Sequence, residues 1–263
     1  MLVSDRLGIP FENITVVHGD TDLVRSGEIT GGSRSVQIGG TNVWRAAGVV
    51  ADKARQIAAR LLEASVEDIV LEDGRFHVAG TPSVTRSWTD VIATAMAMGE
   101  RLDGEGDFTQ ASGTFPSGAH LAVVEVDIET GKVKLREMFA VDDAGCIVNT
   151  LLAEGQVHGG LAQGIGQALY EEFIYDADGN PLTGNFADYG FPSAAEVPSF
   201  VTIHMESPSP MNDLGAKGIG ESGTIGATPA VQNAVVDAVS YLGVRHIDMP
   251  CTAERVWQAV HNC

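Results

Sequence analysis

One acidic residue stands inside a run of glycines in the last fifth of the sequence. Glu221 lies within GAKGIGESGTIGA (residues 215–227), where glycine occupies positions 215, 218, 220, 223 and 226. Because glycine disfavours regular helix and strand and permits unusual backbone angles, we expect an irregular loop whose N–H groups can approach a ligand. A carboxylate in such a loop can meet that ligand and act as a base near neutral pH. The residues alone leave a structural turn with a solvated glutamate equally open.

A second glycine-rich segment lies near the N-terminus. TGGSRS (residues 30–35) combines glycine, three hydroxyl side chains and one arginine, and Gly39 and Gly40 follow shortly after. Hydroxyls, backbone N–H groups and a guanidinium suit a phosphate or another polar group of a cofactor. An ordinary surface loop is the other interpretation of these residues.

A third candidate is a helix expected over residues 152–172. It contains five glycines, each costing roughly 1 kcal/mol relative to alanine within a helix. Gln156 and Gln163 are seven positions apart and so share a helix face, with Gly159 and Gly160 between them. The bare face could admit a ligand that these glutamines reach, or it could serve tight packing against another helix.

Helices and strands must position these segments. Helical periodicity and capping residues, such as Ser87 before a helix and Gly8 after one, alternate along the chain with short β-branched runs. Thr228 and Pro229 are typical of an N-cap and a first helical residue. Helices are thus predicted over residues 2–7, 42–62, 87–98, 152–172, 230–242 and 253–260, and strands over 13–17, 68–71, 75–78, 121–127, 133–139, 171–175, 182–186 and 201–205. This mixture predicts an α+β fold.

The amino-acid composition limits the classes of function that the chain can have. The 263 residues are 44% hydrophobic and 19% charged, which is typical of a globular protein, and the net charge is −19. So acidic a chain disfavours binding to nucleic acid or to an anionic membrane. No apolar run has the length of a membrane span and no secretory signal is evident, so we expect a cytoplasmic protein. Three widely spaced cysteines, Cys146, Cys251 and Cys263, form no disulfide or metal-ligand pattern, which fits a reducing compartment.

Several separated blocks resemble the molybdenum hydroxylases, which include xanthine dehydrogenases, aldehyde oxidoreductases and aerobic carbon monoxide dehydrogenases. GAKGIGESG (215–223) with AVQNAV (230–235) is similar to the C-terminal signature of that family. EGQVHGGLAQGIGQALYEE (154–172) and TGGSRS (30–35) resemble two further blocks, and PCTAERVW (250–257) resembles the usual tail. The resemblance runs over nearly the whole chain, and it is weakest around residues 75–118.

The resemblance implies a specific chemistry. Members bind molybdopterin with molybdenum, in bacteria often as the cytosine dinucleotide, and hydroxylate an electron-poor carbon of an aldehyde or N-heteroaromatic compound with oxygen derived from water. A glutamate at the position of Glu221 is their general base, and no protein side chain is assigned as a metal ligand. By match to the family's contacts, the cofactor-binding residues implied here are Gly32, Ser33, Arg34, Ser35, Gln156, Lys217, Gly218 and Gly220. Electrons would leave through iron–sulfur and FAD subunits, because the chain has neither four-cysteine sets nor a dinucleotide fingerprint.

The family's molybdenum-binding subunit is far longer than 263 residues. The whole chain, residues 1–263, is therefore expected to be the second half of the cofactor-binding region, with mixed sheets, packed helices and glycine-rich cofactor loops. It would be a split subunit or a fragment, active with the remaining half and with the iron–sulfur and FAD subunits. A truncated non-catalytic remnant and a stand-alone phosphate- or nucleotide-binding module are the alternatives.

Overall fold

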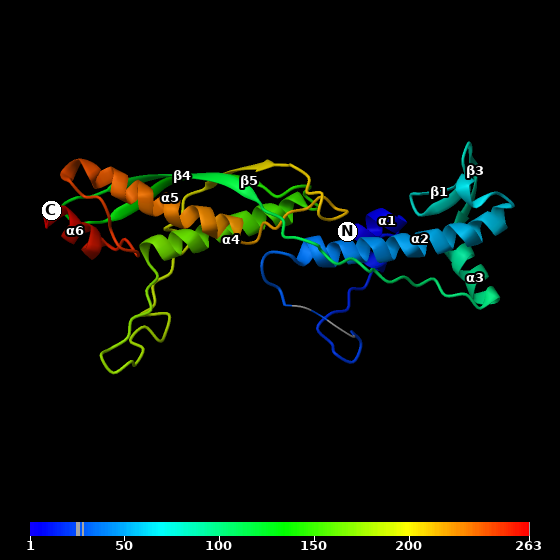
Figure 1. The fold of residues 1–263 in the computed structure, drawn as a ribbon, viewed down its shortest axis with the longest axis horizontal. Helices are drawn as coiled ribbons and strands as arrows, with labels where there is room; N and C mark the ends of the chain where they lie inside the picture. Colours follow the sequence, from blue (N-terminus) through cyan, green and yellow to red (C-terminus); the bar gives the residue numbers. More distant parts are fainter. Residues whose placement is uncertain (25–26, 28, 263) are drawn as a thin grey trace. The chain divides into compact units, whose positions relative to one another are not determined.

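The computed structural model describes residues 1–24, 27 and 29–262, so Cys263 of the three cysteines lies outside the described residues. Two three-stranded sheets and several packed helices confirm the predicted α+β class (Figure 1). The chain divides into two compact units. Unit 1 comprises Met1–Gly113 and Pro210–Leu214, and unit 2 comprises Thr114–Ser209 and Gly215–Cys263.

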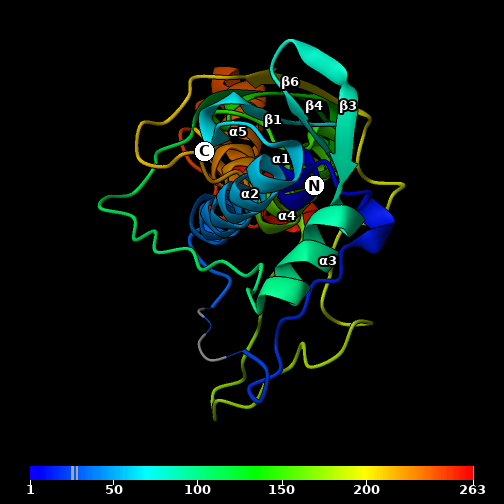
Figure 2. The same cartoon turned by 90° about the vertical axis from the view of Figure 1, so that its right-hand side faces the viewer.

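Unit 1 is built around one long helix. Helix α2 carries alanines and Ile57 on a buried face, which packs against a small antiparallel sheet in the order β1–β2–β3. Phe76 is fully buried and meets the ring of Trp88 edge-on, with 5.0 Å between the ring centroids. Figure 2 shows α3 leaving the end of β3 beside α2. The elements of unit 1 are α1 (Leu2–Leu7), α2 (Thr41–Leu62), β1 (Ile69–Glu72), β2 (Arg75–Val78), β3 (Thr81–Ser87) and α3 (Trp88–Met98).

Unit 2 contains a mixed sheet covered by two helices. Strands β4 and β5 form an antiparallel hairpin, and β6 joins β5 in parallel. Helices α4 and α5 lie side by side along this sheet (Figure 1), and α5 also contacts β4. The main core joins Met138 of β5 to Leu161 and Ile165 of α4 and to the valines of α5. The elements are β4 (Ser117–Val126), β5 (Val133–Asp143), α4 (Thr150–Leu169), β6 (Phe200–Met205), α5 (Ser222–Val239) and α6 (Ala253–His261).

Most of the predicted helices and strands are confirmed. Two helices, α1 and α3, are bounded by the capping residues from which their ends were predicted. Gly8 ends α1 in the left-handed conformation, at φ 63°, with its N–H donating to the Ser4 carbonyl. Ser87 and Asp90 form a reciprocal capping box at the start of α3. The strand β3 was not predicted. Its polar side chains, many of them exposed, lack the apolar alternation that marks a strand.

Two predicted strand regions are wrong. Residues 14–17 are irregular, with Val16 78% and Val17 53% exposed, so the β-branched run there lacks the burial that stabilises a strand. The hairpin predicted over 171–186 is reduced to one isolated bridge between Tyr175 and Pro181. Its aromatic residues pack on one another instead, as Phe173 does on Tyr175 and Tyr189.

Candidate functional site

The segment before Glu221 is hydrogen-bonded to the turn that follows β5. The Cys146 N–H donates to the Gly215 carbonyl at 3.0 Å, and the Lys217 N–H donates to the Ala144 carbonyl at 2.7 Å. Gly215 has φ 65°, and a Cβ atom there would lie 2.9 Å from the Cys146 sulfur. Glycine is therefore required at this point for both its conformation and its lack of a side chain.

A buried ion pair strengthens the same connection. The Lys217 ammonium donates to the Asp143 carboxylate at 2.7 Å, with side chains 14% and 6% exposed. The N–H groups of Gly145 and Ser207 also donate to this carboxylate, each at 2.9 Å. Burial opposes ionisation, but the hydrogen bonds from Lys217, Ser207 and Gly145 outweigh it and hold the pKa of Asp143 well below its ordinary value.

Sequence reasoning missed Asp143. The available signal was a pair of acids, Asp142 and Asp143, at the end of an apolar strand. Lys217 was predicted to bind the cofactor, and its observed partner is Asp143. Whether Lys217 also balances charge on a cofactor stays a prediction.

Helix α5 begins earlier than its sequence predicts. It starts at Ser222 rather than after Thr228, so Gly223 and Gly226 are helical and Pro229 lies inside the helix. The irregular glycine loop is correspondingly shorter and ends at Glu221. Close approach by neighbouring elements explains the helical glycines, because a Cβ atom at Gly223 would lie 2.7 Å from the Val157 carbonyl oxygen of α4.

Glu221 stands at the N-cap position of α5 and is exposed. Its backbone carbonyl accepts the N–H of Ile225, which closes the first turn of the helix. Of the two predicted glycines just before it, Gly218 is buried and Gly220 is exposed.

Four of the five glycines of α4 divide into two sets, and the fifth, Gly166, lies against Glu171 and Pro192. Gly160 and Gly164 face α5, where added Cβ atoms would lie 2.9 Å from the Gly223 Cα and 2.7 Å from the Ala227 Cβ. The Thr224 hydroxyl donates to the Gly160 carbonyl at 3.0 Å across this contact. Tight packing is thus confirmed for these two glycines. The second set consists of Gly155 and Gly159. An added Cβ atom at either of them would have no neighbouring atom within 4 Å among the described residues.

Gln156 lies on the open face of α4, between Gly155 and Gly159, and its side chain is exposed, as is that of Gln163. It directly precedes Val157, whose carbonyl faces Gly223 at the start of α5. Gln156 and Glu221 therefore both lie within two residues of one contact between α4 and α5.

The N-terminal glycine-rich segment has an unusual backbone. Gly32 and Ser33 have φ values of 62° and 51°, and residues 35–40 form a π-helical turn that leads into α2. The Gln37 side-chain amide is buried and donates to the Ser33 carbonyl at 3.0 Å. A serine in the left-handed region and a π-helical turn are both found more often at functional sites than elsewhere. Arg34 and Ser35 follow directly at the start of this turn.

The predicted residues are distributed over both units. Gly32 to Ser35 belong to unit 1, whereas Gln156, Lys217, Gly218, Gly220 and Glu221 belong to unit 2. That the two groups meet at one cofactor stays a prediction.

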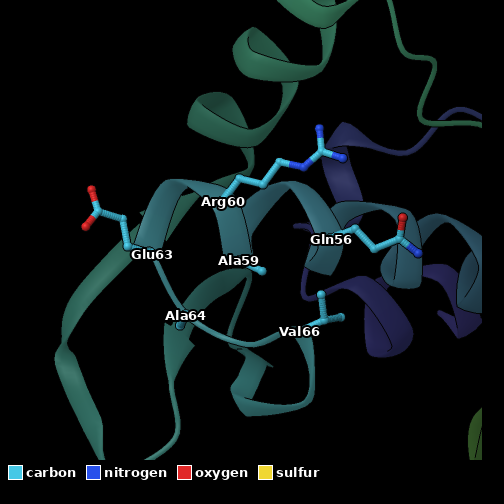
Figure 3. A pocket seen from close by; sticks show the side chains of 6 residues that line it. All are labelled: Gln56, Ala59, Arg60, Glu63, Ala64 and Val66. Carbon is cyan, nitrogen blue, oxygen red and sulfur yellow. The ribbon is translucent and has the colours of Figure 1, made fainter.

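Two hollows on the described surface contain none of the predicted residues. One lies at the end of α2 in unit 1, where Arg60 and Glu63 are among the residues that line it (Figure 3). Another lies in unit 2 beside Tyr170, between the β4–β5 hairpin and residues 195–198. The described residues contain no group of three histidine, cysteine or acidic side chains that could hold a metal ion. No helix among them has the length and apolar character of a membrane span.

Comparisons with known proteins agree with one another. The family model described as "Molybdopterin cofactor-binding domain" matches residues 1–198. The carbon monoxide dehydrogenase large chain of Hydrogenophaga pseudoflava is 38% identical over 268 residues, which cover 99% of this chain and 33% of that protein. The nicotine 6-hydroxylase large subunit of Paenarthrobacter nicotinovorans is 42% identical over 266 residues, which cover 98% of this chain and 33% of that protein.

A solved structure is similar over the same extent. Quinoline 2-oxidoreductase from Pseudomonas putida 86 matches with a TM-score of 0.91 and 37% identity, covering 98% of this chain and 34% of that chain. The chain thus spans about a third of the length of the relatives that it matches.

Proposed function

Since this chain belongs to the molybdopterin cofactor-binding domain family, we propose that it is part of the molybdenum-binding subunit of a hydroxylase, with Glu221 as general base. The observation that carries this proposal is the placement of Glu221 at the start of α5, on a loop fixed to the turn after β5 and two residues before the contact between Gly223 and Val157, the residue after Gln156. The proposed reaction hydroxylates an electron-poor carbon of an aldehyde or N-heteroaromatic compound with oxygen from water. Relatives named for nicotine and quinoline support the second class of substrate.

The residues present fit a molybdopterin cofactor. Gly155 and Gly159 leave the backbone of α4 open beside the Gln156 amide, which can donate to and accept from a pterin. Ser33, Arg34 and Ser35 offer hydroxyl and guanidinium donors to a phosphate. The cofactor is proposed to be molybdopterin cytosine dinucleotide with molybdenum.

The chain's own residues have distinct roles in this proposal. The bound cofactor would supply the two-electron chemistry at its molybdenum. Gln156 and the Gly32–Ser35 segment hold and orient the cofactor, and the Asp143–Lys217 pair fixes the loop that leads to Glu221. The Glu221 carboxylate accepts the proton of the water-derived oxygen as that oxygen bonds to the substrate carbon; the C–H bond at that carbon breaks, and its two electrons would be taken up by the bound cofactor.

The direct test is Glu221→Gln in the assembled enzyme. Glutamine keeps the shape and hydrogen-bonding capacity of the side chain but cannot accept the proton. General-base contributions are typically about 10² to 10⁴ in rate, so kcat should fall at least about a hundredfold while molybdenum content stays at the wild-type level. The pH profile of kcat should also lose its acidic limb. Glu254→Gln, at the first turn of α6, is the matched control and should change neither quantity.

Two results would contradict this assignment. A fully loaded Glu221→Gln enzyme that retained most of its activity would exclude Glu221 as the base. Loss of activity and molybdenum together would show that Glu221 is structural.

The site residues in the two units are proposed to contact one cofactor. Ser33→Ala and Gln156→Ala should then each lower the cofactor content of the purified enzyme, measured as molybdenum and released cytidine monophosphate. Gln163→Ala is the control on the same face of α4. A cofactor-bound structure would overturn the proposal if Gln156 and Ser33 contacted separate ligands.

The proposed partners are the remaining part of the large subunit, an iron–sulfur subunit and an FAD subunit. Relatives described as a large chain or large subunit, of which this chain spans about a third, support the first of these partners, and the family resemblance implies the other two. The chain produced alone should lack molybdenum, and co-production with the partner polypeptides should restore it in stoichiometric amounts. Stoichiometric molybdenum and turnover in the isolated chain would refute the need for partners. A chain that never acquires molybdenum in any combination would indicate a non-catalytic remnant.

A further inference from the structure

A buried histidine–aspartate pair lies on the side of the sheet that faces α5. His120 of β4 and Asp142 of β5 have side chains only 3% and 4% exposed. The His120 Nε2 atom lies 3.3 and 3.2 Å from the two Asp142 carboxylate oxygens. The proposed reaction gives this pair no role.

The imidazole lies directly against the backbone of α5. A Cβ atom at Gly226 would stand 2.3 Å from His120 Nδ1 and 2.6 Å from its Cγ, far inside contact distance. Any side chain at position 226 would thus displace either the helix or the ring. Gly226 is a glycine because this imidazole occupies the space.

Another part of the same helix surface rests on α4. Gly223 meets Val157 and Gly160, and the Thr224 hydroxyl donates to the Gly160 carbonyl. The first two turns of α5 therefore contact both α4 and the His120 ring. Glu221 is the residue immediately before these turns.

A histidine is a costly way to fill this space. His120 Nδ1 is buried and has no hydrogen-bond partner among the described residues, a condition that an apolar side chain would not create. What the histidine gains is a fixed ring orientation, because Asp142 binds Nε2 and an apolar ring has no such restraint. The unfavourable burial of Nδ1 is thus offset by the restraint that Asp142 places on the position of the imidazole ring.

We propose that His120, oriented by Asp142, is a positioning residue that sets the place of the first turns of α5 and so of the Glu221 carboxylate. The role of Glu221 rests on the proposed function, but the contact between His120 and α5 does not. Misplacing a reacting group by about 1 Å can cost as much as about a hundredfold in rate, so this support affects kcat.

The contact itself is tested by a double-mutant cycle on thermal unfolding of the assembled enzyme. Gly226→Ala should lower the melting temperature in the wild-type background. In the His120→Ala background the same change should leave it unchanged or raise it, because the new Cβ occupies the space left by the ring. Gly184→Ala, at an exposed position of unit 2 with no neighbouring atom within 4 Å among the described residues, is the control and should have the same effect in both backgrounds. Equal losses from Gly226→Ala in both backgrounds would overturn the proposal.

The positioning role is tested with Asp142→Asn, which keeps the shape of the carboxylate but weakens its hold on the ring. Amide hydrogen exchange at residues 222–226 should rise about tenfold, because local opening of the first turns becomes easier. With molybdenum content unchanged, kcat should fall about tenfold at constant KM, since the base is present but displaced. Asp248→Asn is the control, because Asp248 pairs with His246 at 2.9 Å on the exposed surface.

The outcomes separate this inference from the proposed function. Unchanged amide exchange at residues 222–226 in Asp142→Asn overturns the inference. The inference is also overturned if exchange rises in Asp142→Asn but its kcat stays unchanged, provided that Glu221→Gln is inactive. Raised exchange spread evenly over α4 and α5 shows a merely structural role and also overturns it. If Glu221→Gln is fully active, the proposed function fails, whereas the exchange result still decides whether His120 positions α5.

Discussion

The two glycine-rich segments differ in how closely other atoms approach their glycines. In residues 215–226 three of the five glycines are points of contact, since Cβ atoms at Gly215, Gly223 and Gly226 would all lie within 3 Å of neighbouring atoms. In the N-terminal segment, Gly32 and Gly39 have no neighbouring atom within 4 Å among the described residues, whereas a Cβ atom at Gly40 would lie 3.1 Å from side-chain carbons of Leu2 and Leu214. Gly215, Gly223 and Gly226 thus bring the backbone close to other residues, whereas Gly32 and Gly39 leave it open.

The difference extends to how each segment is held. Residues 215–217 are bonded to the distant turn 144–146 and to Asp143 through Lys217. In the N-terminal segment, the Gln37 side chain donates to the Ser33 carbonyl, four residues away. We expect substitutions in the first segment to act on stability, because its backbone and Lys217 are bonded to residues far away in the sequence, and those in the second to act on the proposed ligand binding.

The largest expected effect comes from breaking the ion pair that holds the C-terminal segment. Lys217→Met leaves the buried Asp143 carboxylate without its cation, which typically costs about 3 to 5 kcal/mol of unfolding free energy. Lys53→Met is the matched control, because Lys53 and Asp103 pair at 2.9 Å with side chains 42% and 56% exposed. That change should cost at most about 1 kcal/mol. Equal losses in chemical unfolding would show that burial does not distinguish the two pairs.

The contrast between contact and open glycines can be tested within unit 2. Gly223→Ala forces a methyl group against the α4 backbone and should destabilise the protein by about 2 kcal/mol. Gly159→Ala adds the same methyl group where nothing lies within 4 Å, and should stabilise by about 0.5 to 1 kcal/mol through helix propensity. Both are measured by thermal unfolding. The same sign for the two changes would contradict the division of the glycines.

Acidification should loosen the same segment by a smaller amount. Asp143 has a folded-state pKa well below its ordinary value, so its ionised form stabilises the fold above the unfolded pKa of about 3.9 and loses that effect as pH falls toward the folded pKa. Between pH 5 and pH 3 this contribution should decline by about 1 kcal/mol, so unfolding free energy measured at both values should differ less in Asp143→Asn. Asp103→Asn is the control. Because water screens the exposed Asp103 carboxylate, this substitution should change the difference in unfolding free energy between pH 5 and pH 3 less than Asp143→Asn does. If the two variants matched, the buried hydrogen bonds of Asp143 would not be the cause.

Most helices and strands could be predicted from residues that are neighbours in the sequence. The capping box of Ser87 and Asp90 and the glycine after α1 mark helix ends through bonds within a few residues, and these ends were predicted correctly. The start of α5 was predicted wrongly, because propensity disfavours helical Gly223 whereas α4 requires a residue without a side chain there. Tertiary packing therefore overrode the local preference.

The candidate site divides in the same way. Glu221, Gln156 and the Gly32–Ser35 segment are recognisable from local composition and from resemblance. The Asp143–Lys217 pair joins residues 74 positions apart, and the His120 ring meets Gly226 on an element much later in the chain. Only the fold brings these groups together, so the residues that support the site were not predictable from spacing.

The smallest expected effect on stability concerns the open segment, where the backbone itself is strained. Ser33 has φ 51°, a region that costs a residue with a side chain about 1 kcal/mol relative to glycine. Ser33→Gly removes this strain but adds freedom to the unfolded chain, so a net gain of about 0.5 kcal/mol is expected in thermal unfolding. Glu63→Gly is the matched control, since Glu63 has the same φ of 51° at the end of α2 and no proposed ligand. Both variants should gain similar stability, but only Ser33→Gly should lose molybdenum, because only it loses a hydroxyl proposed to hold the cofactor. If both retained the full metal content, the strain at Ser33 would have no more connection with a ligand than the strain at Glu63, and the open segment would be an ordinary surface loop.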